Sequence, residues 1–202
     1  MKKNNLSVQA FDYVQLAFSK YHNHQMHGCI TFNGHLQKDI LEQALNETTI
    51  DLPQLACRFL HGRYLPSKKP LSVELADTSN GAAYASKILT TTKVIDTDAQ
   101  IRVVLLREKD KDRLVIVMNH MLCDGMGFKR YLYLLCYYYN QIIAGVKPQS
   151  QYKGKDRGLS WLKECRLPNK KVERLESKVE DISFEGGDEP VFLNAKVRES
   201  LF

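Results

Sequence analysis

Residues 119–127 read Asn-His-Met-Leu-Cys-Asp-Gly-Met-Gly, and this stretch decides how the rest of the chain is interpreted. A β-rich run ends at Asn119, and a helical pattern begins at Met126. The turn between them places His120 at the edge of a predicted sheet, beside the N–H groups that open the next helix. An imidazole changes its protonation state near neutral pH, so His120 is a candidate general base. The same turn is equally compatible with a structural role.

The segments on either side of this turn predict a hairpin followed by a long helix. Residues 101–108 and 113–119 are β-rich runs joined by the charged turn 109–112, which is typical of an antiparallel hairpin. From Met126 onward, apolar residues recur at helical spacing until Gly145, where a glycine marks the end of the helix.

The upstream part of the chain supplies further elements, which are predicted as helices 8–20 and 36–47 and strands 29–32, 56–60 and 71–75. Strands and helices alternate without a regular parallel repeat. We therefore expect an α/β fold, a two-layer sandwich of a mixed, largely antiparallel sheet with helices packed on it.

Composition excludes several classes of protein. The chain has 202 residues, of which 44% are hydrophobic and 26% charged, which argues against a disordered chain, a collagen-like repeat or a coiled coil. No apolar run is long enough to span a bilayer, and the N-terminus lacks the apolar region of a signal peptide. Five cysteines without paired spacing fit a reducing compartment, so we expect a cytoplasmic location.

The net charge of +6 is local. Residues 147–171 hold eight Lys or Arg and two Asp or Glu, which accounts for the whole excess. A nucleic-acid-binding protein has a more widely spread basic surface, so no nucleic-acid partner is expected. Two interpretations of the segment stay open: a solvated connector, or a patch for a phosphate-bearing ligand that includes Lys153, Lys155 and Arg157.

Residues 119–127 resemble the HxxxDG signature of acyltransferases with the chloramphenicol acetyltransferase fold. That superfamily includes condensation domains of nonribosomal peptide synthetases, plant BAHD acyltransferases, and alcohol and polyketide-associated acyltransferases. The predicted helix 36–47, followed by Leu-Pro-Gln-Leu-Ala-Cys-Arg-Phe at 52–59, is similar to the region upstream of the signature in these proteins. The resemblance covers roughly residues 6 to 147 and implies a chloramphenicol acetyltransferase-like fold.

The resemblance also implies roles for the motif residues. His120 corresponds to the general base that deprotonates a hydroxyl or amine acceptor, which then attacks an acyl thioester. Asp124 corresponds to a structural aspartate turned toward an arginine, for which Arg58 is the expected partner. Gly125 is expected to adopt a backbone conformation, or to allow a close approach, that a Cβ would block. Many members carry a second histidine directly before the catalytic one, and this chain has Asn119 there.

The co-substrate implied by the resemblance is an acyl thioester of coenzyme A or of phosphopantetheine on a carrier protein, with no bound cofactor. The acceptor is a small molecule that carries a hydroxyl or amine. In this interpretation Lys153, Lys155 and Arg157 help to bind the donor's phosphates or an acidic carrier protein.

The position of the motif predicts an incomplete architecture. Most related enzymes resemble two copies of this fold joined in one chain, with the active-site tunnel between the halves. Residues 1–147 correspond to the N-terminal half, and residues 148–202 resemble the crossover toward a second half. Two functions stay open: acyl transfer, with self-association or a separate second-half chain closing the tunnel, or a non-catalytic binding or assembly module.

Other chemistry-bearing residues have two interpretations each. Cys123 is either a nucleophile beside His120 or, as we expect, an inert packed thiol. His22, His24 and His27 have the density of a metal cluster, but they lack a cysteine or carboxylate at ligand spacing, so no metal site is expected. No phosphate-binding glycine loop or dinucleotide fingerprint is present in the sequence.

Overall fold

The structure is a computed structural model that describes residues 6–19, 21, 23–67, 70–90 and 97–151. The chain divides into two units, Met1–Cys165 and Arg166–Phe202, and all described residues belong to the first. The predicted boundary at residue 147 stays a prediction, and Lys153, Lys155 and Arg157 lie outside the described residues.

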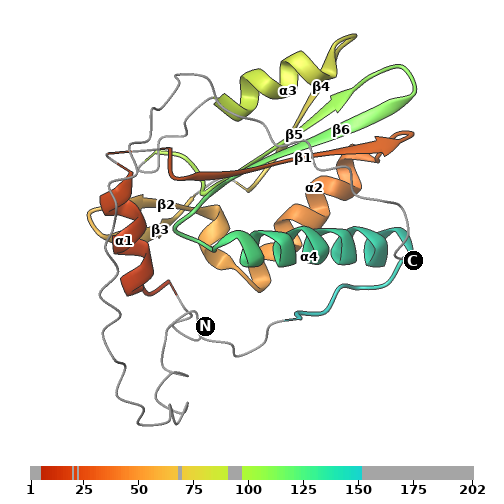
Figure 1. Cartoon of the computed structure of the whole chain (residues 1–202). Coiled ribbons are helices and arrows are strands. Elements are labelled where there is room, and N and C mark those ends of the chain that lie inside the picture. The colour runs from red at the N-terminus through yellow and green to blue at the C-terminus, as the bar shows by residue number, and fades with distance from the viewer. Residues whose placement is uncertain (1–5, 20, 22, 68–69, 91–96, 152–202) are drawn as a thin grey trace, which may run out of the picture. The chain divides into compact units, whose positions relative to one another are not determined.

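A four-stranded mixed sheet organises the first unit (Figure 1). Its order is β1-β6-β5-β4, from strands Gln25–Asn33, Lys111–Asn119, Ile101–Arg107 and Val73–Asp77. β1 and β5 both pair with β6 antiparallel, whereas β4 pairs with β5 parallel. The predicted hairpin of two β-rich runs is confirmed as β5 and β6, and the predicted mixed sheet is confirmed with it.

Helices cover both faces of this sheet. On one face lie α2 (Lys38–Glu47) and α4 (Gly125–Ile143), and on the other lies α3 (Gly81–Thr90) (Figure 1). The sequence predicted α2 and α4 but not α3. The unpredicted helix adds a third layer to the expected two-layer arrangement.

The central strands are buried on both faces because alternate residues enter two separate cores. Val103, Leu105 and Ile116 pack with α2 and α4, while Val104 and Leu106 pack with α3. A continuous apolar run, rather than an alternating one, is typical of a strand covered on both sides. The run that begins at Val103 therefore required a second helical layer.

The remaining elements form a smaller group beside the motif turn. Helix α1 (Ala10–Phe18) is confirmed within the predicted 8–20. A two-stranded sheet joins β2 (Cys57–Leu60) to β3 (Arg63–Pro66), and two short 3-10 helices, η1 (Thr48–Ile50) and η2 (Pro53–Ala56), lead into it.

The chain turns back after α4. Gly145 has φ of 69°, a conformation that glycine adopts without strain, and the chain then passes Asp51 near η1. Asp51 accepts hydrogen bonds from the Tyr138 hydroxyl at 2.8 Å, the Gln151 N–H at 3.2 Å and the Ser150 hydroxyl. These bonds attach the beginning of the predicted crossover to the first unit.

Candidate functional site

His120 lies in the turn directly after β6 and is held from two sides. Its backbone N–H donates to the His24 carbonyl at 2.9 Å. Its imidazole packs on the Phe11 ring of α1, with centroids 5.9 Å apart and planes tilted by 44°. The ring is half-buried, so it is both oriented by contacts and open on one side.

The two ring nitrogens of His120 have different surroundings. Nδ1 is buried and has no hydrogen-bond partner among the described residues. Nε2 is not among the buried side-chain atoms that lack a partner, which makes it the more accessible of the two ring nitrogens. When Nδ1 carries the proton, the Nε2 lone pair is available to accept one.

The side chain of Asn119, the last residue of β6, holds the end of this strand in place directly before His120. It is only 3% exposed, and its Nδ2 donates to Gln100 Oε1 at 2.6 Å while its Oδ1 accepts from the Met121 N–H at 3.0 Å. Gln100 in turn donates through Nε2 to the Cys57 carbonyl at 3.1 Å. The pair thus ties the motif turn to the smaller sheet.

The residue after the histidine anchors the turn by burial. Met121 is fully buried and packs with Cys57, Phe59 and Tyr64 of the smaller sheet. The Leu122 N–H closes the turn by donating to the Asn119 carbonyl at 3.0 Å. The hydrogen bond of the His120 N–H and the burial of Met121 together fix the position of the imidazole.

Asp124 caps α4. Its side chain accepts from the Gly127 N–H at 2.7 Å, which satisfies one of the free donors at the start of the helix. The structure contains no ion pair between Asp124 and Arg58, both of which it describes. Arg58 is exposed because alternate residues of β2 face outward, with Cys57 and Phe59 turned inward. The expected partnership is therefore corrected to a helix cap.

The glycine that the turn requires is Gly127 rather than Gly125. A Cβ on Gly127 would lie 2.6 Å from the Cβ of Cys123, closer than two such atoms can approach. A Cβ on Gly125 would meet no atom within 4 Å, and Gly125 does not have a positive φ. The expected constraint at Gly125 is corrected accordingly.

Cys123 packs beneath the motif turn. Its thiol donates to the Met118 sulfur at 3.5 Å, and it lines an apolar cavity between η2 and α4. The sequence did not predict this cavity, nor did it predict Gln100 or Phe11 as neighbours of the motif. A glutamine ahead of a strand and an aromatic residue on an amphipathic helix carry no distinctive local signal.

The histidine-rich segment does not assemble a metal site in the described part of the chain. His24 is buried directly before β1, His27 is half-buried within β1, and His22 lies outside the described residues. Burial lowers the pKa of His27. Within the described ranges, no group of three or more His, Cys, Asp or Glu side chains is placed to bind a metal ion.

Among the helices of the described residues, none has the length and apolar character needed to cross a bilayer. No protein-family model matches the sequence, and no curated protein matches it.

Solved structures match the chain through its fold. The starter condensation domain of the rhizomide synthetase RzmA is 17% identical, with a TM-score of 0.59, and the match covers 72% of this chain and 39% of that chain. The first condensation domain of the CDA synthetase is 15% identical, with a TM-score of 0.60, covering 74% of this chain and 42% of that chain. A variant of the rhizomide starter domain in complex with C8-CoA is 15% identical, with a TM-score of 0.61, covering 71% and 37%.

These matches confirm the fold that the HxxxDG resemblance implied. The described unit has the condensation-domain fold, which is of the chloramphenicol acetyltransferase type. The chain spans about 40% of the length of the condensation domains it matches.

Proposed function

We propose that this chain takes part in acyl transfer from a thioester to a hydroxyl or amine, with His120 as the general base. One observation carries the proposal. The motif histidine stands at the end of β6, with its ring held against Phe11 and its Nε2 outside the buried core. The fold shared with condensation domains supports the reaction class, because a complex with C8-CoA is among the matched structures.

The proposed reaction needs one proton acceptor and no metal ion. Nε2 of His120 removes the proton from the acceptor as its oxygen or nitrogen attacks the thioester carbonyl carbon. The tetrahedral intermediate then breaks its carbon–sulfur bond. The departing thiolate takes the proton back from the imidazolium, so the free thiol leaves, the acyl product remains, and His120 returns to its neutral form.

We further propose that a second half closes the space over His120. Helix α1, which supplies Phe11, exposes three large apolar side chains spaced three and four residues apart on one face: Phe11 at 38%, Val14 at 47% and Phe18 at 50%. Contiguous apolar surface of this kind marks an interaction site in soluble proteins. A second copy of the chain, or a separate chain with the second half, is the proposed partner.

The proposed donor is an acyl thioester of coenzyme A or of a carrier protein, and the proposed acceptor is a small molecule. In this proposal Lys153, Lys155 and Arg157 attract the donor's phosphates or an acidic carrier protein. Reversing these three charges is expected to weaken donor binding strongly at low salt and little at high salt. Equal donor affinity in the variant and the wild type would exclude that role.

The second candidate function is a non-catalytic binding or assembly module with the same fold. The matched condensation domains, at 15% to 17% identity, support a shared fold and leave turnover untested, so a chain that keeps the fold without catalysis is the alternative. The two candidates differ in turnover. An inert but folded chain supports the module.

The test is product formation by the purified 202-residue chain. Acyl-CoA donors are incubated with a panel of small alcohols and amines, and acylated products are identified by mass spectrometry. Acyl transfer above the protein-free rate supports the proposal. A chain that unfolds cooperatively, binds acyl-CoA and forms no product contradicts it.

A further inference from the structure

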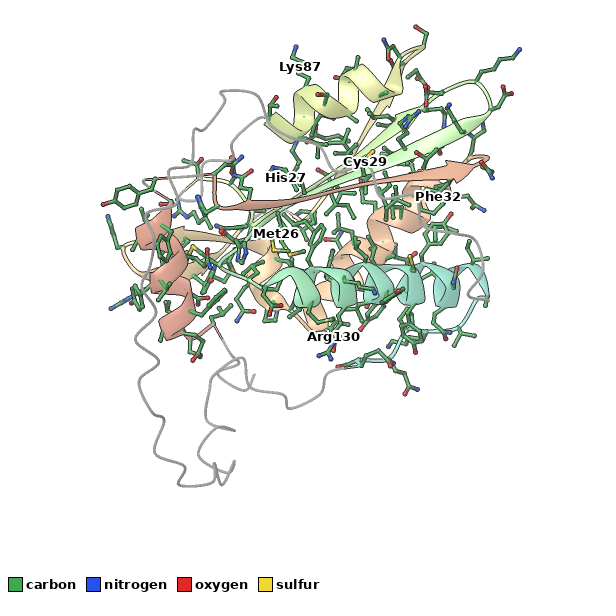
Figure 2. The ribbon with its side chains drawn as sticks, in the orientation of Figure 1. Met26, His27, Cys29, Phe32, Lys87 and Arg130 are labelled. Atoms are coloured by element: carbon green, nitrogen blue, oxygen red, sulfur yellow. The ribbon has the colours of Figure 1, made fainter. Side chains whose placement is uncertain are left out.

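Asn33 and Gly34 form an Asn-Gly pair where β1 ends. Asn33 is the last residue of the strand and lies opposite Lys111 on β6. Phe32, which precedes it, turns into the core shared with α2 and α4 (Figure 2). Because side chains alternate along a strand, Asn33 points to the other face, where it is exposed. Its side chain has no hydrogen-bond partner among the described residues.

An asparagine that is followed by glycine can react with its own main chain. The Gly34 nitrogen loses its proton and attacks Cγ of Asn33, the Cγ–Nδ2 bond breaks, and Nδ2 takes up the proton and departs as ammonia. Water then opens either carbonyl of the resulting succinimide ring, which gives aspartate or isoaspartate at position 33. A Cβ on the following residue hinders this attack, and glycine has none. The surroundings are also open, since a Cβ on Gly34 would meet no atom within 4 Å.

A hydrogen bond at the end of β1 restrains this reaction. The Gly34 N–H donates to the Asp110 carbonyl at 3.1 Å, so the nitrogen must leave that bond before it attacks. The residues that follow are held by Asp112, which accepts from the His35 ring at 2.9 Å and from the Leu36 N–H at 2.8 Å. Strand ends open more readily than strand centres. The frequency with which this end of β1 opens therefore sets the rate.

A second Asn-Gly pair, Asn80 and Gly81, is held more firmly and serves as a comparison. Oδ1 of Asn80 accepts from the Ala83 N–H at 3.2 Å at the start of α3, so its side chain is engaged. The Gly81 N–H donates to Oε1 of Glu108 at 3.2 Å. A Cβ on Gly81 would lie 2.8 Å from Cδ of Glu108, so this pair is tightly enclosed. Two hydrogen bonds must break before Asn80 reacts, whereas one must break at Asn33.

We propose that Asn33 is a site of spontaneous modification, at which water converts the asparagine into aspartate or isoaspartate while Asn80 is preserved. The aspartate product lies opposite Lys111, so its carboxylate gains an oppositely charged neighbour across the strands. The isoaspartate product lengthens the main chain by one carbon just ahead of His35 and shifts this ring relative to Asp112. The modification thus changes how α2 is attached to the β5–β6 hairpin. It does not depend on acyl transfer.

Ageing of the wild-type chain is the first test. The folded protein is incubated at pH 8, and both sites are followed by peptide mass spectrometry. Because one additional hydrogen bond of ordinary strength protects Asn80, Asn33 is expected to react about fivefold faster. The same two sites in urea are the reference, because there only the local sequence differs. A ratio of rates in the folded chain that is no greater than the ratio in urea, or no reaction at Asn33, would overturn the proposal.

A pair of matched variants tests the restraint. His35→Ala removes the contact with Asp112 and is expected to speed the reaction at Asn33 about fivefold, because one hydrogen bond is lost. Gln37→Ala changes an exposed side chain that has no hydrogen bond to β6 among the described residues, and it is expected to leave the rate unchanged. Asn80 is the internal reference, because unfolding of the whole chain speeds both sites alike. Equal acceleration at Asn33 and Asn80, or none at Asn33, would overturn the control by His35.

Hydrogen exchange of the aged protein tests the structural consequence. The Leu36 N–H, which is bonded to Asp112, is expected to exchange faster in the isoaspartate fraction than in freshly purified protein. Asn33→Gln keeps an amide but requires a less favourable six-membered ring, so it is expected to age with neither change. Exchange at Leu36 that is the same in the isoaspartate fraction and in fresh protein would overturn the effect on the attachment of α2.

Discussion

Asn119 shows how a single amide can hold the motif turn in place. Its two side-chain bonds reach Gln100 on one side and the Met121 backbone on the other, and both lie in the buried interior. Many proteins with this motif carry a histidine at this position. An asparagine supplies the donor and acceptor that the turn needs without adding a second titrating group.

Replacing this amide is the first prediction at the residue scale. Asn119→Ala removes two buried hydrogen bonds, to Gln100 Oε1 and from the Met121 N–H, so we expect it to lower the free energy of unfolding by about 2 kcal/mol. Asn140→Ala, at an exposed position on α4, is the control and should change it little. Urea unfolding of both variants measures the difference, and equal stabilities would contradict the clamp.

Asp124 gives a prediction that separates a helix cap from an ion pair. Asp124→Ala should cost about 1 kcal/mol of unfolding free energy, and Asp124→Asn should cost much less because asparagine also caps helices. Arg58→Ala is expected to stay within about 0.5 kcal/mol of the wild type. If Arg58→Ala and Asp124→Ala are equally destabilising and non-additive in a double-mutant cycle, the cap assignment is wrong.

At this scale the sequence singles out the motif but not its neighbours, and the role of His120 stays a prediction. His120 could be singled out because a short spacing pattern surrounds it. The Arg58 partnership failed because which face of β2 turns outward depends on the packing of Cys57 and Phe59. Gln100 could not be found, since its role arises only when β2 and β6 come together.

At the scale of elements, a buried carboxylate at the start of β6 connects the β5–β6 hairpin with the residues that precede α2. Asp112 on β6 is fully buried and accepts bonds from the His35 ring at 2.9 Å, the Leu36 N–H at 2.8 Å and the Arg107 guanidinium at 3.1 and 3.2 Å. Arg107 also donates to the Leu36 carbonyl at 2.7 Å. These bonds hold His35 and Leu36, which precede α2, against the β5–β6 hairpin.

The pH dependence of stability follows from this cluster. Burial raises the pKa of Asp112, but the bonds from Arg107, His35 and Leu36 outweigh it and lower the pKa below the ordinary 3.8. A carboxyl whose folded pKa is lowered adds stability above the unfolded pKa and loses it as pH falls through the folded one. We therefore expect the free energy of unfolding to fall below about pH 4 as Asp112 becomes protonated.

Asp112→Asn tests this expectation. It should lower the free energy of unfolding at pH 7 by about 3 kcal/mol, because Arg107 loses its buried partner, and it should flatten the acid side of the stability profile. Asp110→Asn, in the exposed turn two residues earlier, is the control. Chemical unfolding from pH 3 to pH 7 gives the profiles. If the free energy of unfolding of Asp112→Asn falls with decreasing pH as steeply as that of the wild type, Asp112 is not the source of the acid sensitivity.

Elements with a strong local pattern were predictable and those without one were not. Helix α2 carries a clear apolar face, whereas the first half of α3 is rich in alanine, and its contacts with the sheet come from Ala85, Ile88 and the partly buried Leu89. The parallel pairing of β4 with β5 depends on a connection through α3, so it could not be predicted once that helix was missed.

At the scale of the whole molecule, the proposed partner rests on the apolar face of α1, where Phe11, Val14 and Phe18 are exposed. We expect the chain to self-associate at micromolar concentration, and Val14→Lys combined with Phe18→Lys to make it monomeric while it stays folded. Ile50→Lys, which changes an exposed apolar residue on η1, is the control. Sedimentation velocity measures the state. A wild-type monomer, or a double variant that associates as the wild type does, would contradict this prediction.

The central claim is that His120 acts as the base in acyl transfer, and its most direct test is a rate. Cleavage of hexanoyl-CoA in the presence of ethanolamine, which offers both a hydroxyl and an amine, is followed by release of the CoA thiol. His120→Ala should reduce the protein-dependent rate by about 10²- to 10⁴-fold. His61→Asn, a change in the exposed β2–β3 turn, should leave it unchanged. Equal rates for the wild type and His120→Ala would contradict the account.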